Sequence, residues 1–444
     1  MSRKIQDRTF AYSFIKTVVG FVTTHSYKRF QIEGRENIPA DGCTLWAPNH
    51  TNALMDPMVL NLLTKGPKVF LARADIFKSS PFIVKMLTFF KIMPVYRIRD
   101  GFESVKRNDE TISRAVDVLE DGVPLVIFPE ATHRAKHSLL KLSKGVFHIA
   151  YAVNEKLAGS KPVYILPIGI DYGDYFRFRS TALLRFGKPI DVTAFVREHQ
   201  ELTPPQQMVR LKALLAEEMS KVITFVPDDE DYDAIWEYVK LKADNPECFR
   251  KTLAACEAGE GRKLNGLEKI QAVNKRIVSE ILDLKSKDAE KASEILQKVD
   301  RLRVWRIQNG VSVRSIAGNT SWPKVIMNAL LALIGLPYYL FSVITCLIVW
   351  LPTLLILRHV DDDAFYNTAR FGVRLGLSWI YVIGFAILFF KTLPLLPAAV
   401  LSLLLLPAYN FFTDYREFLR RGLSDVRWLL SRKKAPEIRP HNLV

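Results

Sequence analysis

Short apolar runs alternate with longer helical patterns between about residues 30 and 225. Four runs have the length and continuous apolar character of strands buried on both faces: residues 44–48, 68–72, 123–129 and 163–170. The segments between them, such as residues 112–122, show helical spacing and end at glycine. This alternation predicts an α/β domain over residues 31–225, with helices on a largely parallel sheet.

The pattern changes near Asp228. Residues 226–322 are rich in charged and helix-forming residues, and one apolar stripe recurs at intervals of three and four positions: Ile270, Val273, Ile277, Ile281 and Leu284. We expect a charged helical segment, read as a helical hairpin that packs on the α/β domain or on a partner. The acidic cluster at 228–233 suggests a metal site or, more commonly, a helix start in solvent.

Two apolar blocks follow. Val325 to Leu357 contains no charged residue, and Phe371 to Phe412 is interrupted only by Arg374 and Lys391. Blocks of this length predict a transmembrane helical region over residues 323–413. Two crossings fit best if the basic tail and the basic α/β domain share one side of the membrane. Pro337 and Pro352 leave open that the first block bends into a hairpin.

The charge of the chain favours an anionic membrane as its partner. The formal net charge is +16, and residues 414–444, the expected basic cytoplasmic tail, hold eight Arg or Lys against four Asp or Glu. Nucleic acid would attract the same surface, but the chain carries no nucleic-acid signature. Residues 1–30, with an apolar run from Phe10 to Val22 around Lys16, read as an interfacial amphipathic helix, or alternatively as a signal anchor.

The four cysteines show neither disulfide nor metal-binding spacing. This favours a reducing compartment for the soluble part. We therefore expect an integral membrane protein whose α/β domain lies on the cytoplasmic face of a bacterial inner membrane or an endoplasmic reticulum.

The stretch LWAPNHTNALMDPMVL, residues 45–60, places His50 between an expected strand and an expected helix. α/β proteins commonly carry their sites at such loops. An imidazole there accepts a proton near neutral pH if a carboxylate fixes its tautomer, and Asp56 is the nearby candidate. Six helical positions would turn Asp56 about 240° away, so pairing requires a turn between the two residues. From the residues alone, a lone His beside an Asp is more often structural than catalytic.

A second polar stretch, residues 128–150, follows the strand ending near Pro129. A buried Glu130 would be costly without a donor or a polar ligand facing it. Arg134, Lys141 and Lys144 surround it in the sequence, and Lys144-Gly145 opens a helical pattern, an arrangement suited to a phosphate. The alternative is a surface loop with ordinary ion pairs.

Three weaker signals complete the set of polar candidates. Arg97, at the end of IMPVYR, is placed to bind an anion. His133 and His137, four positions apart, suit a metal only weakly, because no Glu stands where the H-E-x-x-H pattern requires it. Residues 165–170 read as core or as the wall of an acyl site.

Together, four blocks in this order resemble the glycerolipid acyltransferase family, which acylates glycerol-3-phosphate or 1-acylglycerol-3-phosphate. The blocks are NHTNALMD, MPVYR, FPEATHR and LPIGI, and the resemblance covers about residues 31–190. It implies that His50 is the general base, that Asp56 orients it, and that Asn49, Arg97, Glu130 and Arg134 help to bind substrate. It also implies an acyl-CoA or acyl-carrier protein donor, a glycerol-3-phosphate or lysophospholipid acceptor, and no metal or other cofactor.

The chain departs from the family pattern at several positions. Five residues separate His50 from Asp56, as in a subgroup that includes fungal glycerol-3-phosphate acyltransferases, whereas most members have four. In the third block Ala131 replaces the usual Gly and His133 stands where Arg is expected. The second block lacks its usual Gly, with Lys91 nearby.

Three other hypotheses stay open from sequence. One is an acyltransferase for another lysophospholipid or a lyso-aminolipid. Another is a membrane hydrolase that uses His50, although Ser79, Ser80 and Ser143 lack a nucleophile motif. The third, from a different class, is a non-catalytic membrane scaffold built on residues 228–321.

Overall fold

The computed structural model describes residues 4–63, 66–78, 80–95 and 102–436. The chain folds into two compact units. One comprises Met1–Ile223 together with Asp362–Thr368, and the other comprises Thr224–Asp361 together with Ala369–Val444. A short segment from far along the chain thus belongs to the first unit.

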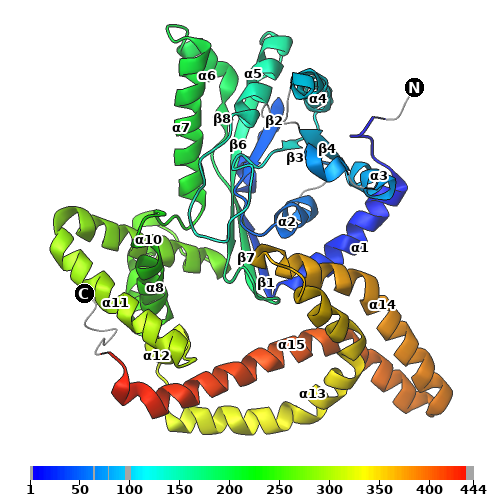
Figure 1. Ribbon diagram of the computed structural model, residues 1–444, viewed down its shortest axis with the longest axis vertical. Helices are drawn as coiled ribbons and strands as arrows, with labels where there is room; N and C mark the ends of the chain where they lie inside the picture. The colour runs from blue at the N-terminus through cyan, green and yellow to red at the C-terminus, as the bar shows by residue number, and fades with distance from the viewer. Residues whose placement is uncertain (1–3, 64–65, 79, 96–101, 437–444) are drawn as a thin grey trace. The chain divides into compact units, whose positions relative to one another are not determined.

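The first unit is built on a mixed, largely parallel sheet of eight strands within the described residues (Figure 1). Along the sheet the order is β1, β7, β6, β2, β5, β3, β4, and β8 pairs with β6. β7 and β8 run antiparallel to β6, while the five strands from β6 to β4 are mutually parallel. The strands are β1 (Arg29–Glu33), β2 (Cys43–Pro48), β3 (Val69–Arg73), β4 (Ile92–Val95), β5 (Leu125–Val126), β6 (Val163–Tyr172), β7 (Thr181–Phe186) and β8 (Ile190–Asp191).

Helices cover the sheet, and a hydrophobic core lies between the helices and the strands. The helices of this unit are α1 (Phe10–Ser26), α2 (Met55–Leu63), α3 (Pro81–Phe89), α4 (Phe102–Glu120), α5 (Gly145–Leu157), α6 (Val192–Glu198) and α7 (Pro204–Val222), with 3-10 turns η1 (Arg35–Asn37) and η2 (Ala74–Lys78). Apolar side chains of α4, α5, α6 and α7 pack with one face of the central strands. The α/β prediction is therefore confirmed.

β2 shows why the site lies where it does. All six of its residues are buried, because strands flank it on both sides and side chains pack on both faces. Leu45 and Ala47 join the core with the helices, whereas Trp46 turns to the other face and meets Phe186. The strand ends at Pro48, so His50 emerges at the carboxyl edge of the parallel strands, the usual place for an α/β site.

The second unit is helical. Its helices are α8 (Tyr232–Asp244), α9 (Pro246–Glu260), α10 (Gly266–Lys287), α11 (Ala289–Gln308), α12 (Val313–Ala317), α13 (Trp322–Leu357), α14 (Tyr366–Thr392) and α15 (Leu395–Ser431), with the 3-10 turn η5 (Arg432–Lys434). The 3-10 turn η4 (Asp363–Phe365) belongs to the first unit. α14 begins within the first unit. Val273, Ile277 and Ile281 of the predicted stripe are buried in a core shared by α8, α10, α11 and α12, whereas Ile270 is exposed. The segment is therefore a packed helical cluster rather than a single hairpin.

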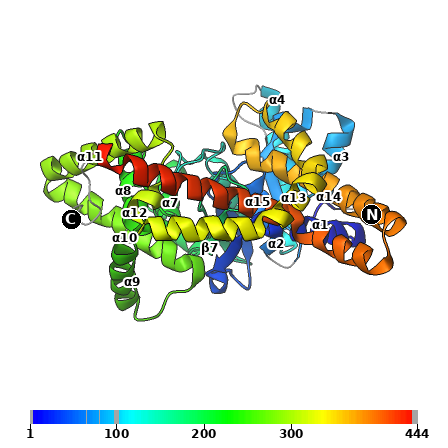
Figure 2. The same ribbon diagram turned by 90° about the horizontal axis from the view of Figure 1, so that it is seen from below.

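Within the described residues, three helices are long and apolar enough to cross a membrane, one more than the two expected. They correspond to Trp322–Leu357, Asp363–Thr392 and Leu395–Lys434. The second apolar block divides at Leu393-Pro394, because Pro394 caps α15 instead of continuing α14. The first block does not fold into a hairpin: α13 continues through Pro337 and Pro352 and lies beside α15 in both views (Figure 2).

Candidate active site

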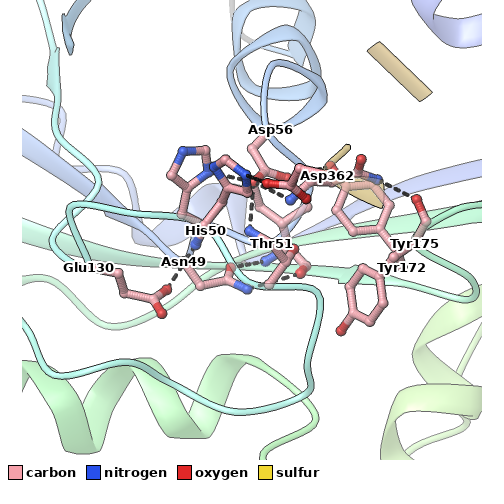
Figure 3. Close-up of polar contacts among 11 residues, drawn as sticks. Asn49, His50, Thr51, Asp56, Glu130, Tyr172, Tyr175 and Asp362 are labelled. Carbon is pink, nitrogen blue, oxygen red and sulfur yellow. Dashed lines mark hydrogen bonds and ion pairs between the residues drawn. The ribbon is translucent and has the colours of Figure 1, made fainter. Parts of the chain in front are cut away.

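His50 and Asp56 meet across a tight turn. His50 follows β2, and α2 begins at Met55, so the chain reverses direction between them. Ala53 has a positive φ of 40°, and the Met55 amide donates to the Asn52 carbonyl at 2.9 Å. The turn brings His50 Nδ1 to 2.8 Å from Asp56 Oδ2 (Figure 3). The turn that the spacing required is therefore present.

Asp56 is fully buried and its carboxylate is saturated with donors. Besides His50 Nδ1, Oδ2 accepts hydrogen bonds from the backbone amides of Thr51 at 2.7 Å and Asn52 at 2.8 Å. A carboxylate only accepts hydrogen bonds, so Nδ1 carries the imidazole hydrogen. In the neutral ring Nε2 then holds the free lone pair, which is the atom a general base uses.

Tyr172, at the end of β6, completes the carboxylate environment, and sequence reasoning missed it. Its hydroxyl donates to Asp56 Oδ1 at 2.7 Å, and its ring stacks on Tyr27 with centroids 5.9 Å apart. The sequence offers only one signal, a tyrosine two positions after the LPIGI block. Nothing in the spacing links it to a residue 116 positions earlier.

The His50 ring lies between two other rings. Phe128 stacks on it at 4.2 Å between centroids, and His133 meets it edge-on at 5.4 Å. The His50 side chain keeps 17% of its surface exposed, and no described residue forms a hydrogen bond with Nε2. The ring is thus fixed at Nδ1 while its other nitrogen is available to a substrate.

Glu130 holds the backbone of His50. Its Oε1 accepts the His50 amide at 2.8 Å and its Oε2 accepts the Leu140 amide at 2.7 Å. The Arg134 amide in turn donates to the His50 carbonyl at 3.1 Å. Of the two partners considered for a buried Glu130, a donor or a polar ligand, the structure provides protein donors. The third block therefore positions His50.

Burial controls the ionisation of this carboxyl group. Glu130 is 5% exposed, and burial raises its pKa to about 6, against the opposing effect of the two amide donors. Its charge is held by hydrogen bonds rather than by a close cation among its described hydrogen-bond partners.

The Asn49 side chain is hydrogen-bonded to the backbone of β6. Its side chain accepts from the Ile170 amide at 2.7 Å and donates to the Ile170 carbonyl at 3.2 Å. Asn49 thereby extends the pairing of β2 with β6 beyond Pro48. It is 2% exposed, and its predicted contact with substrate stays a prediction.

The predicted cations of the third block lie in different surroundings. The Arg134 guanidinium donates from Nη2 to Ser138 at 2.7 Å. Lys141 and Lys144 are exposed just before α5. Burial, together with the like charges of Lys141 and Lys144, lowers the pKa of Lys212 on α7, so these three amines form a basic cluster. Arg97, the remaining predicted ligand, lies outside the described residues.

Ala131, which stands where the family has Gly in the third block, and Lys91, near the second block, both have a positive φ. Ala131 has a φ of 58° and Lys91 a φ of 62°, values that favour glycine. The Lys91 ammonium donates to the carbonyls of Ile5 and Asp7, both at 2.7 Å, which anchors the N-terminal arm. Ala131 and Lys91 thus both adopt a left-handed conformation that usually favours glycine.

Sequence reasoning also missed a segment from between the apolar blocks. Asp362 Oδ2 lies 2.9 Å from His133 Nε2, and Asn367 donates to the Tyr175 carbonyl at 2.5 Å. His133 and Asp362 are 229 positions apart, so no local pattern indicates the contact. Among the residues with described side chains, no three His, Cys, Asp or Glu residues are grouped to hold a metal ion.

Part of the chain is similar to known proteins. Residues 29–171, which include both His50 and Asp56, match the family model described as Acyltransferase. No curated protein sequence matches the chain. One solved structure that it resembles is the 1-acyl-sn-glycerophosphate (LPA) acyltransferase PlsC from Thermotoga maritima, at 19% identity and a TM-score of 0.33, over 48% of this chain and 83% of that one.

Proposed function

We propose that the protein is an acyltransferase that moves a fatty acyl group from a thioester to a lipid-precursor hydroxyl at a membrane, because residues 29–171 match the family model described as Acyltransferase. The observation that carries the proposal is the contact between His50 Nδ1 and Asp56 Oδ2 inside the matched region. The donor is acyl-CoA or an acyl-carrier protein, and the acceptor is glycerol-3-phosphate or lysophosphatidate.

In the proposed reaction His50 acts as the general base. Nε2 takes the proton of the acceptor hydroxyl while the hydroxyl oxygen attacks the thioester carbonyl carbon. Collapse of the tetrahedral intermediate breaks the C–S bond, and the leaving thiolate takes the proton back from the imidazolium. Asp56 stabilises the imidazolium and keeps the hydrogen of the neutral ring on Nδ1.

The surroundings of the pair support this role. Asp56 is buried and held by amides and by Tyr172, so its charge is oriented before substrate arrives. Glu130 and the Arg134 amide fix the His50 backbone from both sides. We therefore assign catalysis to His50 and Asp56 and positioning to Glu130. Binding of phosphate groups falls to Arg97, Arg134, Lys141 and Lys144.

The three apolar helices support a membrane-borne acceptor. Exposed aromatic side chains on α1 and α3, including Phe10, Phe14 and Phe82, suit contact with a lipid surface. We place the catalytic domain on the cytoplasmic face, where the basic tail would meet anionic lipid head groups.

The experiment supplies acyl-CoA or acyl-carrier protein with glycerol-3-phosphate, lysophosphatidate or a lyso-aminolipid to the full chain in detergent. Released thiol and acylated product are measured together. We expect His50→Ala and Asp56→Ala each to lose at least about 10²-fold in kcat. The control is His148→Ala, an exposed histidine on α5. Wild type that releases no more thiol than His50→Ala would refute the enzyme and leave the scaffold hypothesis standing.

A further inference from the structure

The segment Asp362–Thr368 lies between two candidate membrane helices in the sequence but folds with the α/β unit. In sequence it follows α13, which ends at Leu357, and it contains the start of α14. Both helices are candidate membrane spans. In space the segment belongs to the α/β unit. It is therefore a connector between two membrane helices that folds as part of the enzyme domain.

The first attachment of this connector is Asp362 to His133. Asp362 Oδ2 lies 2.9 Å from His133 Nε2, and Oδ1 accepts the Ala364 amide at 2.9 Å. Phe365, in the same turn, meets the His133 ring edge-on at 5.2 Å between centroids. The turn thus contacts His133 through both a carboxylate and a ring.

His133 in turn borders the proposed reaction site. Its ring centroid is 5.4 Å from that of His50. A hydroxyl bound at His50 Nε2 would come within reach of a ring at that distance. Because Asp362 accepts from Nε2 of His133, it also decides which nitrogen of that ring carries the hydrogen.

The second attachment reaches the first sequence block. The Tyr175 carbonyl accepts two side-chain amides, from Asn367 at 2.5 Å and from Asn52 at 3.1 Å. Asn52 lies in the turn between His50 and Asp56, and its own amide donates to Asp56. The connector therefore contacts His133 directly and shares the Tyr175 carbonyl with the turn that lies between His50 and Asp56.

We propose that Asp362 is a positioning residue of the acyltransferase site, holding His133 beside His50 at the place where the acceptor binds. Acceptor binding then depends on the connector between the membrane helices. This inference rests on the proposed function. The Asp362 side chain is 55% exposed, and exposed ion pairs contribute little to stability. If Asp362 had only a structural role, its substitution would consequently change stability and kinetics little. If it positions His133, the substitution changes acceptor binding.

The test compares Asp362→Asn with wild type, as the full chain in detergent, by measuring kcat and KM separately for donor and acceptor. Losing one charge-assisted hydrogen bond should raise the acceptor KM about 3- to 10-fold, while the donor KM changes less than about 2-fold. The matched control is Asp361→Asn, which removes an exposed carboxylate one position away. In a His133→Ala background Asp362→Asn should add no further loss, because the pair acts as one unit.

Asn367→Ala provides a second variant with the same expected direction, because it removes the other attachment. Wild type without acyl transfer would refute the proposed function and this inference together. Active wild type with an unchanged acceptor KM in Asp362→Asn would overturn the inference and leave the function intact. A parallel fall in Tm with equal rises in both KM values would likewise overturn it, because that pattern marks a structural residue.

Discussion

Tyr172 donates its hydroxyl hydrogen to Asp56 Oδ1 at 2.7 Å, on the carboxylate oxygen that His50 does not use. Both side chains are buried. Burial and the neighbouring Asp56 charge raise the pKa of Tyr172 well above its usual value, so the phenol remains a donor at any working pH. Asp56 is consequently held from the sheet side by β6 and from the helix side by the turn before α2.

Removing that hydroxyl should slow catalysis without removing the ring. In Tyr172→Phe the buried Oδ1 loses its donor, which costs about 1–3 kcal/mol, and the orientation of Asp56 loosens. We expect kcat to fall about 10-fold, with KM values nearly unchanged. The measurement is steady-state acyl transfer, and Tyr164→Phe on the same strand is the control. A Tyr172→Phe enzyme with wild-type kcat would show that the amides and His50 suffice to position Asp56.

Ala131→Gly should stabilise the protein. Ala131 sits at φ 58°, in a turn closed by its own amide and the Phe128 carbonyl at 3.1 Å, and an alanine there costs about 1 kcal/mol relative to glycine. We expect the free energy of unfolding of the detergent-solubilised Ala131→Gly variant to exceed that of wild type by about this amount. Ala135→Gly, in the same loop but without a positive φ, should instead lower stability, because glycine has more backbone freedom when unfolded. Equal effects of the two changes would contradict the argument.

The basic cluster should act on phosphate-bearing substrates. Replacing Lys141 and Lys144 together by alanine removes two exposed charges beside α5, and we expect the KM of such a substrate to rise several-fold at low salt. The difference should shrink as salt increases, because screening already weakens the wild-type attraction. Exposed Lys287 and Lys291, replaced in the same way, serve as the charge-matched control. An effect that is independent of salt would contradict an electrostatic role.

The sequence predicted the elements better than their lengths. Residues 44–48 became β2 and residues 163–170 became most of β6, because continuous apolar runs suit strands buried on both faces. The run 123–129, in contrast, gave only the two residues of β5. Pro124 precedes β5 and Pro129 follows it, and proline has no amide hydrogen to donate to a neighbouring strand.

Local spacing showed what a pairing of His50 with Asp56 requires, a turn in place of a regular helix, and the two side chains do meet across a turn. The partners that complete the site lie too far along the chain. Tyr172 and Asp362 reach it through the order of the strands and the return of the segment after α13, and neither is encoded in the spacing around them. A sequence signal for such contacts requires knowledge of the tertiary fold.

Glu130 should make stability depend on pH in the acidic range. Burial raises its pKa from 4.5 to about 6, so between these values the folded protein holds a proton that the unfolded chain releases. The group stabilises the fold fully below about pH 4.5, and this contribution is lost as pH rises through about 6. A shift of this size corresponds to about 2 kcal/mol, and Glu130→Gln lacks it. Unfolding of wild type and variant from pH 4.5 to 7, with exposed Glu155→Gln as the control, should show the wild-type advantage shrinking by that amount as pH rises. If the difference instead grew with pH, the two amide donors would outweigh burial in setting the charge of Glu130.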